Sequence, residues 1–232
     1  MTDDVQSLWV ESCAALLTLV DDTAVAERWD APSCLPGMTI GALCGHVIAS
    51  GIFEVESRVT HDAAVAGSDT ATPSYSGPLI EAPTQSDGRP MTAANLHALV
   101  PADDGHAAHR AVEAAAVEQA GNGMEDLVSR GRIAFATARV GVERTDADVV
   151  VDCWGVPLSF DEFLRTRIVE MVVHAEDLAD SMALESSGLP DEAKELACNI
   201  GIAAAIRRNG PTSVLRALFR SDRHSTAALR PL

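Results

Sequence analysis

A carboxylate and an imidazole lie four residues apart inside an otherwise apolar segment, RIVEMVVHAEDL, residues 167–178. Between Ile168 and Ala175, Glu170 and His174 are the only polar side chains. On a helix, a spacing of four places two side chains one above the other on the same face, so the two form a pair. Because a charge buried without a partner is costly, the pair must be satisfied by its own members, by a third residue or by a metal ion.

A second imidazole, His46, lies in another apolar segment, IGALCGHVIASGI, residues 40–52. If the two segments are neighbouring helices, two neutral imidazole nitrogens and one carboxylate converge. Three protein ligands of these kinds with one open position are typical of a catalytic zinc site. The residues alone leave a second interpretation open, in which Glu170 and His174 lie on a solvated face or form a hydrogen bond within their helix. Apolar neighbours on both sides of the pair argue against the solvated face.

The elements that must position these side chains are predicted to be helices, so the expected fold class is all-α. Hydrophobic residues make up 47% of the chain and aromatic residues only 4%, which suits packed helices better than a sandwich or barrel. Ser159 and Glu162 form a capping-box pattern that begins the helix carrying Glu170. A β-branched run and a Trp-Gly turn within residues 148–160 predict a small hairpin just before that helix. Apolar periodicity predicts further helices within residues 3–30, 40–65, 106–120, 124–142, 191–208 and 210–219.

The charge balance and the hydrophobic runs argue against several classes of partner. With 34 acidic and 17 basic residues, the chain has a net charge of −17 and no Lys/Arg cluster, so we expect no nucleic-acid partner. No apolar run approaches the roughly 20 residues of a membrane helix, and the start MTDD lacks the basic region of a signal peptide. Five scattered cysteines, of which only Cys44 is near a candidate ligand, indicate reduced thiols. We therefore expect a soluble cytoplasmic protein, monomer or homodimer, with no membrane partner.

Residues 67–105 differ in character from the rest of the chain, since they hold five of the eleven prolines and the only tyrosine. Periodicity returns only in a short helical piece at about Thr92 to Val100. A long irregular segment in a compact domain is typical of a lid or binding loop, and simple disorder is the alternative. The histidines outside the two apolar segments have polar or irregular surroundings and are assigned no function: His61, His97, His106, His109 and His224.

Two stretches of the chain resemble the signatures of one family. WDAPSCLPGMTIGALCGHVIASG, residues 29–51, is similar to the Trp, Pro-Ser, Leu-Pro-Gly-[Trp/Met]-Thr and Leu-x-x-His pattern of the mycothiol-dependent maleylpyruvate isomerase family, a branch of the DinB-like four-helix metalloenzymes. LRTRIVEMVVHAEDLA, residues 164–179, resembles the family's Arg-x-x-Glu-x-x-x-His-x-x-Asp-Leu helix. The two stretches occur in the family's order, and the resemblance covers about residues 3–185.

The resemblance implies a DinB-like up-down four-helix bundle with zinc or a similar divalent metal at one end, held by His46, Glu170 and His174. The open position of the metal would receive mycothiol, a small sugar-inositol-cysteine thiol that serves as co-substrate. A thiol on a divalent metal loses its proton well below its free pKa of about 8.5, so the metal would make the nucleophile. Relatives either isomerise maleylpyruvate through addition of this thiolate to a double bond or transfer the thiol to an electrophile.

Three further residues are candidates for the site, and Arg167 and Asp177 join Glu170 as catalytic candidates. Arg167, one turn before Glu170, could neutralise it or bind an anionic substrate or the thiol, and a surface arginine is the alternative. Asp177, one turn after His174, could orient that imidazole, and a surface charge is the alternative. Trp154, at the hairpin turn, could line the mouth of a thiol-binding pocket or pack the hairpin on the bundle.

The C-terminal part departs from the characterised isomerase of the family, which has a mixed α/β C-terminal domain. Here the bundle helix is expected to fade near residues 186–190, and residues 186–232 read as a short helical extension beside a metal-binding domain at residues 1–185. This favours a metal-dependent thiol transferase that acts on a small electrophile in detoxification or biosynthesis, with cis-trans isomerisation of the maleylpyruvate type as the alternative. A bundle that binds a metal or ligand without catalysis is an alternative of another class.

Overall fold

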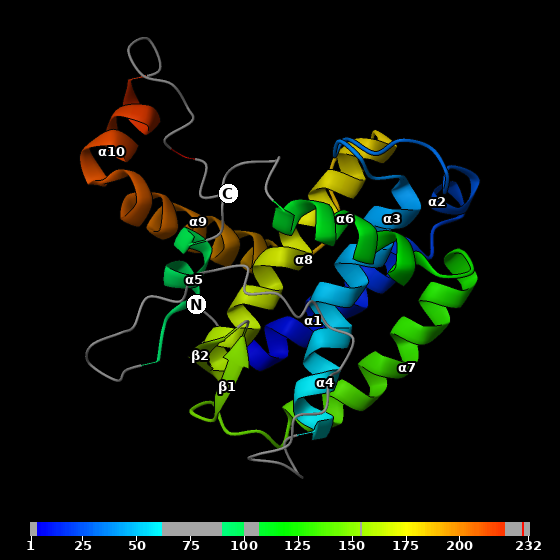
Figure 1. Cartoon of the computed structure of the whole chain (residues 1–232), viewed down its shortest axis with the longest axis horizontal. Helices are drawn as coiled ribbons and strands as arrows, with labels where there is room; N and C mark the ends of the chain where they lie inside the picture. Colours follow the sequence, from blue (N-terminus) through cyan, green and yellow to red (C-terminus); the bar gives the residue numbers. More distant parts are fainter. Residues whose placement is uncertain (1–3, 62–89, 100–106, 154, 221–228, 230–232) are drawn as a thin grey trace.

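Four long helical segments form the body of the protein (Figure 1). They are α1 (Val5–Val20), α3 to α4 (Ile40–His61), α7 (Met124–Val142) and α8 (Phe160–Met182). The computed structural model describes residues 4–61, 90–99, 107–153, 155–220 and 229. Within these, α1 and the α3–α4 segment each pack against both α7 and α8, which closes a ring of four. The prediction of an all-α DinB-like bundle is confirmed.

The N-terminal segment forms two helices where the sequence predicted one. After α1 the chain begins a new helix, α2 (Thr23–Glu27), because the side chain of Asp22 accepts a hydrogen bond from Ala24 N at 2.8 Å. Aspartate is favoured at such a cap and disfavoured in a helix interior. The acidic pair Asp21–Asp22 therefore divides the amphipathic run.

The helix that carries His46 is continuous from Ile40 but changes its winding midway. It consists of α3 (Ile40–Ile48), a π-helical turn η1 (Ala49–Phe53) and α4 (Glu54–His61). Thr39 caps its start by accepting a hydrogen bond from Ala42 N at 3.1 Å. The predicted end near residue 65 lies outside the described residues. Wide turns of this kind are frequent at functional sites.

A small hairpin precedes α8, as the sequence predicted. Strand β1 (Val150–Cys153) pairs antiparallel with β2 (Val156–Ser159), with Val150 opposite Ser159. Ser159 also caps α8, since its hydroxyl accepts a hydrogen bond from Glu162 N at 3.3 Å. The hairpin therefore leads directly into the helix that carries the Glu170–His174 pair.

Two helices come from the regions between the bundle segments. Helix α5 (Ala93–Leu99) confirms the short helical piece predicted at about 92–100, and it packs on α8 and on α9. Helix α6 (Ala107–Ala120) packs closely on α3, because Gly45 has no side chain: a Cβ there would lie 2.6 Å from the carbonyl oxygen of Ala116. The rest of the lid-like segment proposed at 67–105 lies outside the described residues.

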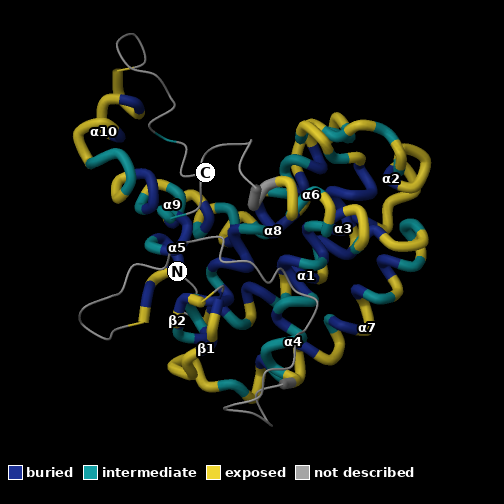
Figure 2. The backbone as a smooth tube through the Cα atoms, viewed as in Figure 1, coloured by how far each residue is buried: buried dark blue, intermediate teal, exposed yellow. Residues whose placement is uncertain are grey.

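The C-terminal extension is helical, as predicted. Helix α8 ends at Met182, and the next residue, Ala183, adopts a left-handed conformation with φ 57°. Helices α9 (Asp191–Asn209) and α10 (Pro211–Phe219) follow, and α9 packs on α8, α5 and α1. Its inner residues join the core of the bundle (Figure 2). The domain division at residue 185 stays a prediction, and most of the tail after Ser221 lies outside the described residues.

One stretch, Ile40–Thr60, is long and apolar enough to cross a membrane by composition, although the sequence alone suggested no such run. Its mean hydropathy is 1.2, and 67% of its most apolar window is buried inside the protein. Burial to this extent is typical of the core helix of a bundle. His46 lies within this buried stretch, which is why its neighbours in the sequence are apolar.

Candidate metal centre

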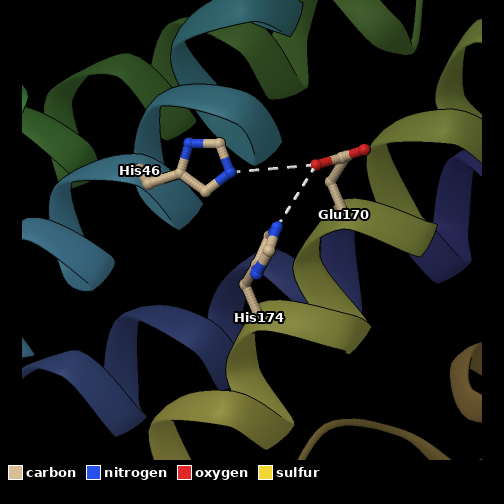
Figure 3. A group of neighbouring side chains, drawn as sticks. All are labelled: His46, Glu170 and His174. Atoms are coloured by element: carbon tan, nitrogen blue, oxygen red, sulfur yellow. Dashed lines mark ion pairs between the residues drawn. The ribbon is translucent and has the colours of Figure 1, made fainter. Parts of the chain in front are cut away.

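His46 from α3 meets Glu170 and His174 from α8 at one place between the two helices (Figure 3). The Oε2 atom of Glu170 lies 3.9 Å from Nε2 of His46 and 3.6 Å from Nε2 of His174. The two imidazole rings stand edge to face, with 4.6 Å between their centroids. Within the described part of the chain, this is the only group of three or more His, Cys, Asp or Glu side chains whose ligand atoms all lie within 4.8 Å of one another.

The spacing and the donor types of these three residues fit a tetrahedral zinc ion. Ligand atoms about 2.1 Å from zinc at tetrahedral angles lie roughly 3.4 Å apart. The Glu170 oxygen lies 3.6 and 3.9 Å from the two imidazole nitrogens, which is only slightly longer, and all three ligand atoms lie within 4.8 Å of one another. Two imidazoles and one carboxylate leave one coordination position open. The three side chains are 15–19% exposed, so this side of the site reaches the solvent.

Close contacts between η1, α1 and α8 set the distance between the two helices. A Cβ atom on Gly51 would lie 2.3 Å from Cγ of Met171, the neighbour of Glu170. Trp9 of α1 donates a hydrogen bond from Nε1 to the carbonyl oxygen of Gly51 at 3.0 Å. Only glycine leaves room for the Met171 side chain at this position, and the indole holds the π-helical turn in place. His46 and Glu170 face each other as a result.

Asp177 contacts His174 on the side away from the cluster. Its Oδ2 lies 3.0 Å from Nδ1 of His174, so the Nδ1–H donates to the carboxylate and Nε2 remains directed at Glu170. The carbonyl oxygen of Asp177 accepts hydrogen bonds from Ser181 Oγ at 2.7 Å and Cys34 Sγ at 3.2 Å. Cys34 belongs to the first signature and Asp177 to the second, so the two signatures meet beside the site. A catalytic role for Asp177 stays a prediction.

The environment drives the three candidate ligands to different protonation states. Burial and the nearby His174 lower the pKa of His46 to about 3, so this imidazole is neutral. Burial by itself lowers the pKa of His174, but Asp177 and Glu170 outweigh it and raise the value to about 9. Burial opposes ionisation of Glu170, yet His174 and Arg167 hold its pKa well below the usual range. Without a metal, His174 is protonated, and its positive charge lies between the carboxylates of Glu170 and Asp177.

Arg167 is fully buried, so the alternative of a surface arginine is wrong. Its Nη1 donates hydrogen bonds to Glu54 Oε2 at 2.6 Å and to the carbonyl oxygen of Ser50 at 3.3 Å. This ion pair fastens α8 to the η1–α4 segment, and the charge of Arg167 also helps to keep Glu170 ionised. Direct contact of Arg167 with a thiol or substrate stays a prediction.

Two other residues singled out in the sequence have different outcomes. Cys44 is buried, and burial raises the pKa of its thiol to about 12, so it is held as a neutral thiol. Trp154, proposed to contact the thiol at the pocket mouth, lies outside the described residues. All five cysteines are free thiols, in agreement with the absence of a disulfide framework.

The prediction of polar or irregular surroundings for His97 is wrong. The side chain is only 3% exposed and lies on α5, where it interacts electrostatically with Glu170 and Arg167. The sequence did carry a signal, since Ala93, Leu96 and His97 follow a helical spacing of three and four. All three are buried.

Comparisons with known proteins agree with the signatures. The model of the mycothiol maleylpyruvate isomerase N-terminal domain family matches residues 9–179, a span that includes His46, Glu170 and His174. Comparisons with curated proteins and with solved structures returned no significant match. The family match covers well over half of the 232 residues. The chain therefore belongs to the mycothiol maleylpyruvate isomerase N-terminal domain family.

Proposed function

We propose that this protein is a metal-dependent thiol transferase, which activates mycothiol or a similar low-molecular-weight thiol and transfers it to a small electrophile. The observation that carries the proposal is the convergence of His46, Glu170 and His174 on one partly exposed side of two packed helices. A divalent metal such as zinc, when bound there, would lower the pKa of a coordinated thiol and supply a thiolate at neutral pH. Family membership supports mycothiol as that thiol.

Two of the cysteines are unsuited to act as nucleophiles, whereas the exposed Cys34 thiol donates a hydrogen bond to the carbonyl oxygen of Asp177 beside the site. Burial raises the pKa of the Cys44 and Cys153 thiols to about 12, so neither ionises near neutral pH. In the proposed reaction the external thiol supplies the sulfur: its proton leaves, a sulfur–carbon bond forms, and the electrophile takes up the proton or releases a leaving group. The chain's own residues bind the metal and hold the His174 proton on Nδ1, next to Asp177. A reducing cytoplasm is the compartment that suits free cysteines and such a thiol.

The family name gives a second candidate, a cis-trans isomerase of the maleylpyruvate type. Both activities begin with addition of a thiol to an unsaturated carbon. In the isomerase the thiol is expelled again, whereas in the transferase it stays on the product. Product analysis therefore separates the two.

The test is thiol-dependent turnover by the zinc-loaded full-length protein with saturating mycothiol, a panel of electrophiles, and maleylpyruvate. We expect Glu170→Gln to lower kcat by about 100-fold or more, because the ligand set loses its charge. Cys44→Ala is the matched control from the same pair of helices, and we expect its kcat to stay within about twofold of the wild type.

Three results would contradict the proposal. Lost turnover in Cys44→Ala, with Glu170→Gln still active, would make a protein thiol the nucleophile. Isomerised maleylpyruvate without any thiol adduct would establish the isomerase. Zinc and mycothiol binding without turnover of any acceptor would make the protein a binding bundle.

A further inference from the structure

His97 is a buried imidazole whose two ring nitrogens have no hydrogen-bond partner. The side chain is 3% exposed, so surface water does not form hydrogen bonds with the two ring nitrogens. An imidazole always carries at least one N–H group, and a buried polar group without a partner destabilises the fold. A histidine in this position therefore needs a partner that the described protein atoms do not provide.

Three hydrogen bonds tie the helix that carries His97 and the residues just before it to neighbouring elements. The backbone N of its first residue, Ala93, donates a hydrogen bond to Glu162 Oε2 at 2.6 Å. The predicted capping box is therefore only half formed, by the bond from Glu162 N to Ser159 Oγ. Just before the helix, Met91 N donates to the carbonyl oxygen of Pro157 at 2.9 Å. Near its end, Arg208 Nη2 donates to the carbonyl oxygen of Ala98 at 3.0 Å. These contacts fix the backbone around the imidazole.

His97 lies on α5, which packs on α8, the helix that carries Glu170 and His174, and it does not belong to the ligand cluster. It interacts electrostatically with Glu170 and Arg167, and it is absent from the group whose ligand atoms lie within 4.8 Å of one another. Burial, the largest influence, lowers its pKa, so the ring is neutral and offers one N–H donor and one acceptor nitrogen. Such a group suits a neutral or anionic oxygen of a small molecule.

We propose that His97 contacts the electrophile, donating its N–H to a carbonyl or carboxylate oxygen of the molecule that reacts at the metal centre. That this molecule is an electrophile rests on the proposed function. With a carbonyl-conjugated acceptor, the sulfur–carbon bond forms, the π electron pair moves to the carbonyl oxygen, and the resulting enolate takes up the proton that the thiol lost. A fixed N–H shielded from water stabilises the charge on that oxygen.

The experiment compares His97→Phe, which removes both nitrogens at similar volume, with His97→Gln, which restores an N–H donor. The control is Leu96→Val, which alters the packing of the same helix without removing a polar group. Each full-length protein is loaded with zinc to measure turnover of mycothiol with benzylideneacetone, an aryl enone. Each is also loaded with cobalt to measure the affinity for acetohydroxamate, a small metal ligand with a carbonyl oxygen.

We expect His97→Phe to keep one metal per chain and an equal or higher Tm, because the unpaired nitrogens are gone. Its kcat/KM should fall by about 10- to 100-fold and its acetohydroxamate affinity by about 10-fold, with partial recovery in His97→Gln. In wild-type protein, the ring ¹⁵N resonances of His97 should move when acetohydroxamate is added. Leu96→Val should lower the Tm and leave kcat/KM unchanged.

The outcomes separate this inference from the proposed function. If acetohydroxamate affinity depends on His97 while the wild-type protein turns over no thiol, the transferase proposal fails and the His97 contact stands. Unchanged affinity and turnover in His97→Phe, with unmoved ¹⁵N resonances, would overturn the contact. Loss of metal and of Tm in both His97 variants would also overturn it, since the imidazole would then be structural.

Discussion

His174 is the residue at which a proton and a metal compete for the same nitrogen. Its Nε2 lies 3.6 Å from Oε2 of Glu170 and its Nδ1 lies 3.0 Å from Oδ2 of Asp177, and these carboxylates raise its pKa to about 9. His46, with a pKa lowered to about 3, is already neutral, and Glu170 is already ionised. Zinc binding at pH 7 should therefore release about one proton, all of it from His174.

The sign of the pH dependence follows from the same pKa. Below about pH 9 a proton on His174 opposes the metal, so apparent zinc affinity should rise about tenfold per pH unit and level off above that value. In the metal-free protein, the raised pKa of His174 stabilises the folded state. This contribution is fully present below pH 6.5 and is lost as the pH rises through about 9. Calorimetry in buffers of different ionisation enthalpy measures the protons. Release of none, or of two, would contradict the assignment.

At the scale of elements, the approach of η1 to α8 decides whether the ligands meet. In Gly51→Ala the new Cβ would lie 2.3 Å from Met171 Cγ, an atom in the middle of its side chain, so α8 must move. Overpacking of this kind costs about 1–3 kcal/mol. Because Met171 adjoins Glu170, we expect zinc affinity to fall together with Tm. Thermal unfolding and zinc titration of the variant measure both.

Gly131→Ala on α7 is the matched control for this variant. Its Cβ would lie 3.0 Å from Cδ2 of Leu17, the end of a side chain that can shift, and alanine favours the helix by about 1 kcal/mol. We expect nearly unchanged Tm and zinc affinity. Equal losses in both variants would show that any added methyl group in the bundle is harmful and would remove the special role of the η1 contact.

At the scale of the whole molecule, a metal at this site would tie together helices more than 100 residues apart in the sequence, since His46 and Glu170 come from α3 and α8. Zinc at about 1,000 times its Kd should stabilise the fold by about 4 kcal/mol, which raises Tm by roughly 10 °C in a chain of this size. A chelator should reverse the shift and His174→Ala should abolish it.

Magnesium is the control metal for this shift, because it requires octahedral oxygen ligands and the site offers two nitrogens. We expect magnesium to leave Tm unchanged in differential scanning calorimetry. A zinc shift of the same size in His174→Ala would place the metal elsewhere and leave a hydrogen-bonded Glu170–His174 pair as the better description of the site.

The sequence by itself determined the features that depend on local rules. Apolar periodicity and the caps at Thr39 and Ser159 predicted the bundle helices, because each cap needs only a side chain and an amide three residues away. The spacing of four between Glu170 and His174 placed both on one helix face for the same reason. The apolar segment at residues 40–52 indicated His46 as a possible third member, and the signatures indicated the family.

Tertiary structure alone decided the features that depend on residues far apart in the chain. Arg167 pairs with Glu54 across 113 residues, and Glu162 accepts a hydrogen bond from Ala93 N across 69 residues. No periodicity links such partners, so the sequence could not distinguish a surface arginine from a buried one. The burial of His97 depends on where α5 packs. The side chains of a short helix become buried only where other helices, here α8 and α9, cover one of its faces.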